Sequence, residues 1–574
     1  MPTNPLRDLR ELVLEAEERK GNRPAIKTKR DGKWQATTYR QLRERVGYLA
    51  TFYSESGLKK GDRISVLSEN RTEWCVAYLA AVSSGIVAVP IDRDLKPREV
   101  KHILNFAESR LLVCGGDYLN ALEGVKDDVP SLLQVVSMDE PKGDAGITYQ
   151  EALKQGKKAW RSNPFFQEAT VDPDDLAVII FTSGTTGNSK GVMLTHANLA
   201  ADIVATSQHV SVADEHDVML SVLPLHHTYE CTGGFLMALY QGSLICHGES
   251  LRRIPENMAE TKTTIMLGVP LLFEAIYRRI EEGMKKKGEG KVRLAKRIAS
   301  LTEVFGINIR GRIFKEVHKR FGGRLRLLIS GGAAIDPAVS KGFRELGIDS
   351  IQGYGMTEAS PIIAVNRINY FKDAAVGPPL DGVEVKIEQG EILVRGAIVM
   401  PGYFQNPEAT AETIRDGWLH TGDLGYLDDD GFLFINGRKK SVIVTPNGKN
   451  VYPEEIEAQL NQSPYILESL VWGGPQDDPL KVEVQAIIVP NSEAFDQEFG
   501  VSGYDEEKIR QAINGQVKQI CRQIANYKRV KKFVLRHEEF EKTTTKKVKR
   551  YLYTGKQQSV RSEETPESEA PASG

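Results

Sequence analysis

Residues 175–194 read DLAVIIFTSGTTGNSKGVML, and this stretch decides the interpretation of the fold. The apolar run that ends at Phe181 predicts a buried strand, and an extended pattern resumes at Val192. Between them, glycines can turn backbone N–H groups toward an anion, hydroxyl side chains add donors, and a lysine adds positive charge. The loop therefore predicts a polyphosphate site. The residues expected to hold the phosphates are Thr182, Ser183, Gly184, Thr185, Thr186, Gly187 and Lys190.

Two other motifs resemble parts of this loop. The Walker A pattern is excluded, because Ser189 stands where a glycine should precede the lysine and because a strand rather than a helix follows. Residues 187–191 match G-x-S-x-G, but the nucleophile motif of serine hydrolases needs a helix after the serine. A serine hydrolase is kept as the alternative from another enzyme class, beside a nucleotide-binding module without catalytic activity.

The rhythm of apolar runs along the chain predicts two domains. Short buried-strand runs alternate with helical patterns up to about residue 435, as in an α/β protein. Beyond that point, residues 483–489 predict a strand, and apolar residues at steps of three and four from Ile509 to Ile524 predict an amphipathic helix. The expected organisation is a large α/β N-terminal domain over 1–437, a hinge over 438–440, a smaller mobile α+β C-terminal domain over 441–553 and a disordered tail over 554–574.

Composition narrows the class of protein. A chain of 574 residues exceeds what one hydrophobic core of roughly 250–300 residues supports. A net charge of -2 gives no reason to expect a nucleic-acid partner, and five scattered cysteines suggest neither disulfides nor a zinc site. The charged N-terminus lacks the apolar stretch of a signal peptide, so a cytoplasmic protein is expected. The expected oligomeric state is a monomer or homodimer.

One region departs from this neutrality. Residues 278–326 contain 16 Lys and Arg against 5 Asp and Glu. Solvated helix faces are the simpler interpretation. The alternative is a basic surface that docks peripherally on anionic membrane at its inner face.

Four further segments follow the loop in order. They are GYGMTE at 353–358, DGWLHTGD at 416–423, GRKK at 437–440 and KTTTKKVKR at 542–550. Together with the loop they resemble the motifs of the adenylate-forming superfamily, which includes acyl-CoA synthetases, luciferases and the adenylation domains of peptide synthetases. The resemblance covers the chain up to about Tyr553 and implies the two-domain fold of that superfamily.

The resemblance implies a nucleotide site in the large domain. The ring of Tyr354 would stack on adenine, opposite flat backbone at Gly332 and Ala333. Thr357 would bond the α-phosphate, and Glu358 would hold Mg²⁺, a cation that prefers carboxylate and phosphate oxygens.

The segments nearer the C-terminus supply the remaining expected groups. Asp423 would accept the ribose hydroxyls, and Arg438, fifteen residues later, would add a second contact to the nucleotide. Lys440 matches the family's hinge, and Lys547 matches its catalytic lysine. Because Lys546 replaces the glycine expected before that lysine, the choice between the two lysines stays open.

The acid is implied by a further block, LPLHHTYE at 223–230. It resembles a block of the long-chain fatty acid CoA ligases in which His227 gates the carboxylate. The resemblance thus implies an enzyme that uses ATP and Mg²⁺ to convert a fatty acid to acyl-AMP with release of pyrophosphate and then transfers the acyl group to coenzyme A. An aryl or medium-chain acid, or an acyl carrier protein as acceptor, remains an alternative; the absence of a carrier domain after Arg550 favours a free thiol.

Overall fold

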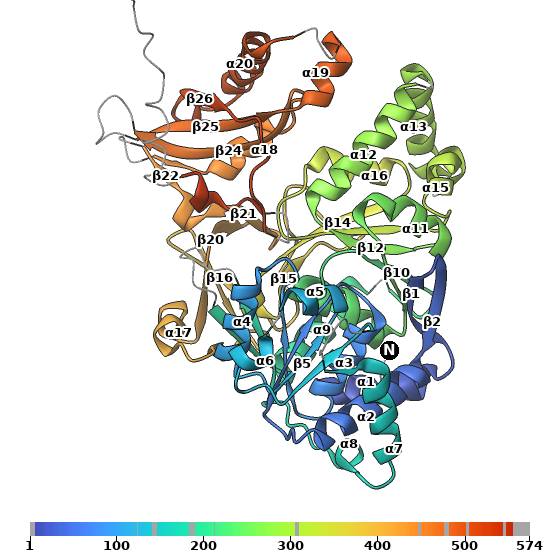
Figure 1. The fold of residues 1–574 in the computed structure, drawn as a ribbon. Coiled ribbons are helices and arrows are strands. Elements are labelled where there is room, and N and C mark those ends of the chain that lie inside the picture. Colours follow the sequence, from blue (N-terminus) through green and yellow to red (C-terminus); the bar gives the residue numbers. More distant parts are fainter. Residues whose placement is uncertain are drawn as a thin grey trace, which may run out of the picture. The chain divides into compact units, whose positions relative to one another are not determined.

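The computed structural model forms two compact units, one over Met1–Thr421 and Tyr426–Phe434 and the other over Gly422–Gly425 and Ile435–Gly574. Figure 1 labels the helices and strands of each unit. The structure describes residues 6–122, 124–140, 146–182, 190–211, 213–286, 288–304, 309–445, 449–475, 482–500, 504–543 and 547–554. The predicted tail lies outside this range apart from Thr554.

The first large sheet has the strand order β18-β9-β8-β4-β3-β5-β6-β7. Pairing is parallel from β8 through β7, while β9 runs antiparallel to both β8 and β18. Its central strands β3, β4 and β5 are almost entirely buried, which explains the uninterrupted apolar runs in the sequence. The bounds are β3 (Arg63–Leu67), β4 (Val87–Pro90), β5 (Leu111–Cys114), β6 (Gln134–Ser137), β7 (Ile147–Thr148), β8 (Leu176–Thr182), β9 (Lys190–Thr195) and β18 (Gly402–Tyr403).

The second large sheet has the order β15-β14-β13-β12-β10-β11-β1-β2. Its central strands from β14 to β1 are parallel, and the edge strands β15 and β2 are antiparallel to their neighbours. The bounds are β1 (Pro24–Arg30), β2 (Lys33–Thr38), β10 (Val218–Ser221), β11 (Leu244–His247), β12 (Ile265–Gly268), β13 (Leu327–Ser330), β14 (Asp349–Gly355) and β15 (Ile362–Val365).

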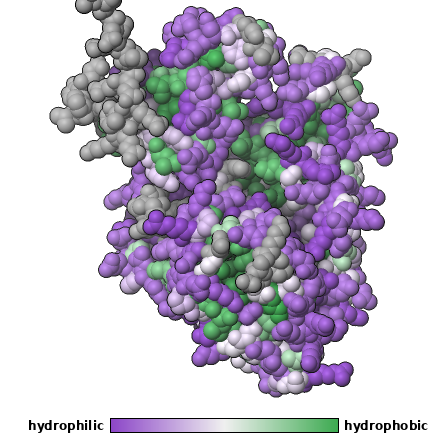
Figure 2. Space-filling model, in the orientation of Figure 1, coloured by the Kyte–Doolittle hydropathy of each residue, from purple (hydrophilic) through white to green (hydrophobic). Residues whose placement is uncertain are grey.

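Helix α3 (Thr72–Val82) packs against β3 and β4 of the first sheet and β1 of the second. All of its residues are buried, as expected for a helix that is apolar on every side. Of the helices in the described part of the chain, none is long and apolar enough to cross a membrane. Hydrophilic residues cover most of the face drawn in Figure 2, where apolar residues gather in patches.

Further helices of the first unit surround the two sheets. Helices α2 and α7 pack closely, since a Cβ atom on Gly156 of α7 would lie only 1.8 Å from the backbone oxygen of Tyr48 on α2. The helices are α1 (Leu9–Lys20), α2 (Tyr39–Glu55), α4 (Pro97–Phe106), α5 (Gly116–Ala121), α6 (Val125–Asp128), α7 (Tyr149–Ala159), α8 (Phe165–Glu168), α9 (His196–Val210), α10 (Met237–Gln241), α11 (Ile254–Thr261), α12 (Pro270–Lys285), α13 (Glu289–Val304), α14 (Arg310–Ile313), α15 (Lys315–Arg320), α16 (Pro337–Glu345) and α17 (Pro407–Thr413), with the π-helix η1 (Tyr229–Leu236) and the 3₁₀ turns η2 (Leu251–Arg253) and η3 (Thr357–Ala359).

A third sheet, of order β16-β17-β20-β19 with β21 paired to β20, includes the points where the two units divide. Its long strand β20 passes from the first unit into the second at Gly422 and returns at Tyr426. The bounds are β16 (Glu384–Glu388), β17 (Glu391–Arg395), β19 (Ile414–Arg415), β20 (Trp418–Leu427) and β21 (Leu433–Arg438).

The second unit is built on the sheet β24-β25-β26, drawn in orange and red in Figure 1. Apolar residues of the sheet share one core with Ile456 of α18 and with Ile513 and Val517 of α20. The bounds are η4 (Lys439–Ser441), β22 (Ile443–Val444), β23 (Asn450–Val451), α18 (Pro453–Leu460), β24 (Ile466–Pro475), β25 (Val482–Pro490), α19 (Ser492–Phe499), α20 (Glu506–Gln523), η5 (Asn526–Lys528), β26 (Lys532–Leu535) and η6 (Arg550–Leu552).

The predicted α/β and α+β classes are confirmed, as are the strand at 483–489 and the amphipathic helix that follows it. The structure groups residues 435–437 with the second unit, although the sequence analysis assigned them to the large domain.

Candidate functional site

The two ends of the predicted phosphate loop lie side by side. Thr182 ends β8, Lys190 begins β9, and the two residues pair across the antiparallel ladder. The Thr182 hydroxyl donates a hydrogen bond of 3.5 Å to the Lys190 backbone oxygen. The intervening predicted residues Ser183, Gly184, Thr185, Thr186 and Gly187 lie outside the described residues. A strand follows Lys190, so the strand–turn–helix context of a hydrolase nucleophile is absent at this described end of the loop.

Tyr403, which the sequence analysis did not single out, connects Lys190 with Glu358. The Lys190 Nζ atom lies 4.7 Å from the centre of the Tyr403 ring, and the Tyr403 hydroxyl donates a 2.9 Å hydrogen bond to Glu358 Oε1. Burial, and then the nearby Glu358 carboxylate, raise the pKa of Tyr403, so this hydroxyl stays protonated and remains a donor. The basic end of the phosphate loop and the predicted metal ligand therefore share one neighbour.

The position of Tyr403 follows from strand pairing. Short strand β18 pairs with β9, which sets Tyr403 opposite Val192. Two backbone hydrogen bonds fix the neighbourhood: Phe404 N–H donates to the Gly191 oxygen at 2.7 Å, and Met400 N–H donates to the Glu358 oxygen at 2.9 Å. A local motif search could not find this contact, because the paired segments are separated by about two hundred residues.

The predicted adenine site lies at the carboxyl ends of two neighbouring strands. Tyr354 is near the end of β14, and the loop with Gly332 and Ala333 follows β13, which is paired in parallel with β14. Gly332 has φ of +85° and Ala333 is exposed. Thr357 and Glu358 follow on the η3 turn and are both partly exposed. Ligands of open α/β sheets bind at such strand ends.

Gly331 has a packing role at this edge. A Cβ atom there would lie 2.8 Å from the ring of Tyr229, the first residue of π-helix η1. The Tyr229 hydroxyl donates a 2.8 Å hydrogen bond to the backbone oxygen of Ile329 on β13. The predicted adenine loop and η1 are thus joined by a single tyrosine.

Asp423 and Arg438 are adjacent in the second unit. They lie on the paired strands β20 and β21, and Arg438 Nε is 2.7 Å from Asp423 Oδ1. The Asp423 side chain is 5% exposed, whereas that of Arg438 is half exposed. The structure thus brings together the two residues predicted to bind the ribose and the nucleotide.

The predicted hinge and catalytic lysine also belong to the second unit. Lys440 lies on the exposed turn η4. Lys547 is exposed, and its backbone oxygen accepts a 2.8 Å hydrogen bond from Thr543 N–H; Lys546 lies outside the described residues. Arg550 anchors this terminal element by a bidentate pair with Glu457, at 2.8 and 2.9 Å.

His227 lies in the turn between β10 and η1, and this turn is held by Asn70. The Asn70 side chain donates 3.0 and 2.7 Å hydrogen bonds to the Ser221 hydroxyl and the Leu223 oxygen and accepts one of 3.1 Å from the Leu225 N–H. His227 itself is partly buried, and the centre of its ring lies 4.2 Å from that of His226, with the two ring planes tilted by 48°. Sequence reasoning missed Asn70, which comes from the loop between β3 and α3.

Glu230, the second residue of η1 and three residues after His227, is 2% exposed. Burial raises its pKa to about 8, although hydrogen bonds from Ser221 and Leu223 act in the opposite direction. Its Oε2 atom has no hydrogen-bond partner among the described residues. Glu230 is therefore uncharged at neutral pH.

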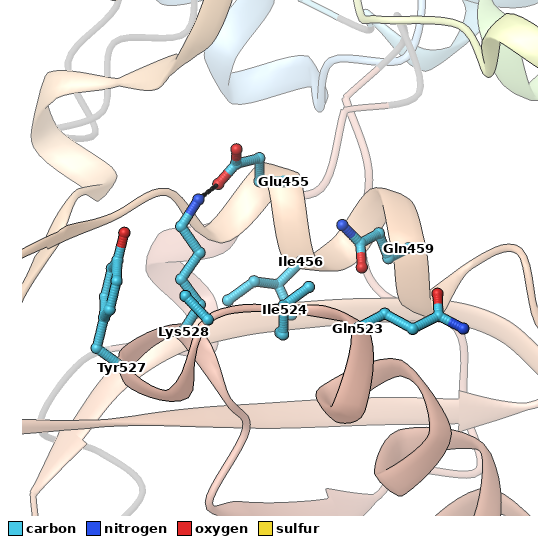
Figure 3. Close-up of a pocket in the computed structure, with 8 residues that line it drawn as sticks. Glu455, Ile456, Gln459, Gln523, Ile524, Tyr527 and Lys528 are labelled. Carbon is cyan, nitrogen blue, oxygen red and sulfur yellow. Dashed lines mark hydrogen bonds and ion pairs between the residues drawn. The ribbon is translucent and has the colours of Figure 1, made fainter.

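A cavity of about 270 Å³ lies in the second unit between α18 and the chain that follows α20 (Figure 3). Its wall includes Ile456, Ile524 and the ion pair of Lys528 with Glu455, at 2.6 Å. It contains none of the predicted site residues.

Comparisons with known proteins agree over nearly the whole chain. It is 29% identical over 563 residues to the long-chain-fatty-acid–CoA ligase FadD15 of Mycobacterium bovis, covering 92% of each chain. It is 31% identical over 501 residues to the peroxisomal long chain acyl-CoA synthetase 7 of Arabidopsis thaliana, covering 80% of this chain and 69% of that protein.

Solved structures share the fold. ATP-bound MatB from Rhodopseudomonas palustris has a TM-score of 0.73 at 26% identity, with 95% of this chain and 98% of that chain covered. The anthranilate CoA ligase AuaEII with anthranoyl-AMP has a TM-score of 0.78 at 22% identity, with 96% and 97% covered, and supports the fold alone.

The family matches divide the chain in two. Residues 440–561 match the C-terminal domain of AMP-binding enzymes. Residues 13–404 match the AMP-binding enzyme family. This segment contains the phosphate loop, Tyr354, Glu358 and Tyr403. The chain belongs to the AMP-binding enzyme family.

Proposed function

We propose that this protein is an acid–thiol ligase that uses ATP to convert a long-chain fatty acid to acyl-AMP and then to acyl-CoA. The observation that carries the proposal is the meeting of Lys190 and Glu358 at Tyr403, at the base of a loop suited to polyphosphate. Relatives named as long-chain fatty acid CoA ligases span most of the chain and support the choice of acid and thiol.

The first chemical step joins two anions, because a carboxylate must attack the α-phosphate. The site must therefore offset charge repulsion and stabilise charge on the phosphoryl oxygens. Lys190 and Thr357 would contact the phosphates, and the partly exposed Glu358 carboxylate suits Mg²⁺, which proteins commonly bind through one or two carboxylates and substrate phosphates. When bound, Mg²⁺ supplies positive charge to the triphosphate. Tyr403 orients the Glu358 carboxylate for that role.

The second unit would contribute the remaining nucleotide contacts and the catalytic lysine. Asp423, mostly buried and held by Arg438, would accept the ribose hydroxyls. The exposed Lys547 would stabilise the reacting phosphate during adenylate formation. Rotation about Lys440, between the domains proposed at 1–437 and 441–553, would then withdraw Lys547 and admit the thiol of coenzyme A.

The acid would enter past His227 and lie along η1. Neutral Glu230 adds no negative charge to repel the substrate carboxylate. The apolar side chains of η1 suit an acyl chain.

ATP–pyrophosphate exchange with acids of graded chain length tests the proposal. We expect exchange to be greatest with long-chain fatty acids and lower with aryl or medium-chain acids. Exchange that proceeds equally without any acid would overturn the function. Acyl transfer to an acyl carrier protein but not to coenzyme A would overturn only the thiol acceptor.

We also propose that α13 docks on anionic membrane, where a water-insoluble acid is collected. Leu294, Ile298 and Leu301 are 60%, 44% and 64% exposed, and their spacing of four and three sets them on one helix face. In the sequence, the Lys and Arg residues of 278–326 lie on both sides of these three apolar residues. A combination of apolar and basic side chains favours an anionic lipid surface.

Vesicle co-sedimentation tests the docking. The chain should bind vesicles that contain phosphatidylserine, and the double change of Leu294 and Leu301 to Gln should weaken binding. Leu133→Gln, which changes a leucine of 45% exposure elsewhere, is the matched control. Equal binding to neutral and anionic vesicles would refute the docking surface.

A further inference from the structure

Asp92, His226 and His227 form a cluster of three potential metal ligands in the first unit. Asp92 follows β4 of the first large sheet, and the histidines follow β10 of the second. One ligand atom from each residue lies within 4.8 Å of the other two. Two imidazoles and a carboxylate are donors typical of sites for zinc and other divalent transition metals.

The His226 side chain is the strongest indication that a metal ion binds here. It is 6% exposed, and its Nε2 atom has no hydrogen-bond partner among the residues that the structure describes. Nε2 lies 3.5 Å from Asp92 Oδ1. That separation exceeds the ~2.7–3.2 Å of an ordinary N–H···O hydrogen bond.

The same separation suits two ligands that share one ion. Donor atoms about 2.0–2.1 Å from a tetrahedral zinc ion are themselves about 3.3 Å apart. The His226 and Asp92 atoms are therefore close to this spacing, and a ring nitrogen of His227 lies within 4.8 Å of both.

The cluster is both supported and accessible. Asn70 fixes the backbone just before the histidines through its contacts with Leu223 and Leu225, which limits the loss of freedom on binding. The Asp92 side chain is 22% exposed, so the carboxylate side of the cluster is open to solvent.

We propose that Asp92, His226 and His227 bind one divalent transition metal ion of the zinc class, and that this ion inhibits the enzyme by engaging His227. Metal binding does not depend on the proposed function. The inhibition rests on it, because His227 is the residue assigned to admit the acid.

Cobalt(II) titration of the full-length protein, stripped of metal and kept in excess Mg²⁺, tests binding. Mg²⁺ in excess fills sites made of oxygen ligands alone. We expect one Co²⁺ per chain with the visible absorption of a four- or five-coordinate ion, which Zn²⁺ displaces. Weak absorption of six-coordinate Co²⁺ alone, or no saturable binding, would overturn the site.

Asp92→Asn and His226→Gln should each weaken Co²⁺ binding about tenfold or more. His216→Gln is the matched control, since His216 is an exposed histidine with Nε2 3.7 Å from Glu215 and lies outside the cluster. Thermal unfolding checks that each variant is folded, and the nearly isosteric Asp92→Asn at a partly exposed position keeps the test usable if His226→Gln does not fold. Unchanged affinity in Asp92→Asn, or an equal loss in His216→Gln, would refute the assignment.

Inhibition is measured as acyl-AMP formation at buffered free Zn²⁺ with excess Mg²⁺–ATP. The wild type and His216→Gln should be inhibited at the same Zn²⁺ concentration, and Asp92→Asn should require about tenfold more. If Co²⁺ binding depends on the cluster but inhibition is equal in all three proteins, the claim that the bound ion inhibits the enzyme is refuted while the metal site stands.

Discussion

Replacing Glu230 with glutamine should flatten the pH dependence of the stability of the first unit. Burial raises the Glu230 pKa from 4.5 to about 8 in the folded protein. Between these values the folded state holds a proton that the unfolded state has released, so stability falls as pH rises. The stabilisation is fully present below about pH 4.5 and is lost as pH rises through about 8.

The magnitude follows from the width of this window. Each pH unit changes the free energy of unfolding by ~1.36 kcal/mol, so the change from about pH 5.5 to about 7.5 is ~2.7 kcal/mol. For a unit of about 430 residues, an unfolding entropy of ~2.1 cal/mol/K per residue converts 1 kcal/mol to about 1 °C. The Tm of the wild type should therefore fall by about 3 °C relative to that of Glu230→Gln across this interval.

Differential scanning calorimetry of both proteins over this pH range provides the measurement. Other titrating groups, including the buried Asp202 whose pKa burial also raises, are common to both proteins and cancel in the difference. Glu412→Gln, on an exposed position of α17, controls for the loss of a carboxylate. A difference in Tm between wild type and Glu230→Gln that does not vary with pH would refute the claim that Glu230 is protonated in the folded protein.

Gly156→Ala should lower the Tm of the first unit by about 3 °C, because the added Cβ meets the Tyr48 backbone at 1.8 Å and overpacking costs ~3 kcal/mol. The control Gly515→Ala, at a helix position with open space, should instead stabilise the second unit by ~1 kcal/mol. Equal effects of the two substitutions would contradict the packing argument. Asn70→Ala should raise the KM for the acid about tenfold with a smaller effect on the KM for ATP, since it removes hydrogen bonds worth ~1–3 kcal/mol from the turn before His227. Asn70→Asp keeps the acceptor for Leu225 N–H but sets a carboxylate oxygen against the Leu223 carbonyl oxygen, so it should lose at least as much. An equal rise in the KM values for the acid and for ATP would exclude a local role. Lys547→Ala should abolish acyl-AMP formation yet spare acyl-CoA formation from supplied acyl-AMP; loss of both steps together would contradict its separate role in the first.

Local patterns in the sequence were sufficient to predict the strands and the ends of the phosphate loop. Runs such as Ile64–Leu67 and the strand before Thr182 are buried on both sides, so their composition alone distinguishes them. The pairing of Asp423 with Arg438 also follows from short spacing, since both lie on adjacent strands of one sheet.

What could not be predicted depends on contacts between distant segments. Tyr403 reaches Glu358 only because β18 pairs with β9, and Asn70 reaches the Leu223–Leu225 turn from a loop about 150 residues earlier. The protonation of Glu230 depends on complete burial, which a periodic pattern does not reveal on an irregular π-helix. The role of Arg550 likewise needed the position of Glu457, because a basic cluster by itself suggests only a solvated surface.

The contact between Tyr229 and Gly331 limits how the enzyme could be redesigned. Tyr229 opens the helix along which we propose that the acid lies, and its ring fills the space beside the loop that we assign to adenine. Selectivity for the acid and affinity for the nucleotide are therefore mechanically coupled through one aromatic ring. Libraries that vary η1 to accept new acids should retain this tyrosine, or variants with altered acid preference will also be variants with weakened ATP binding.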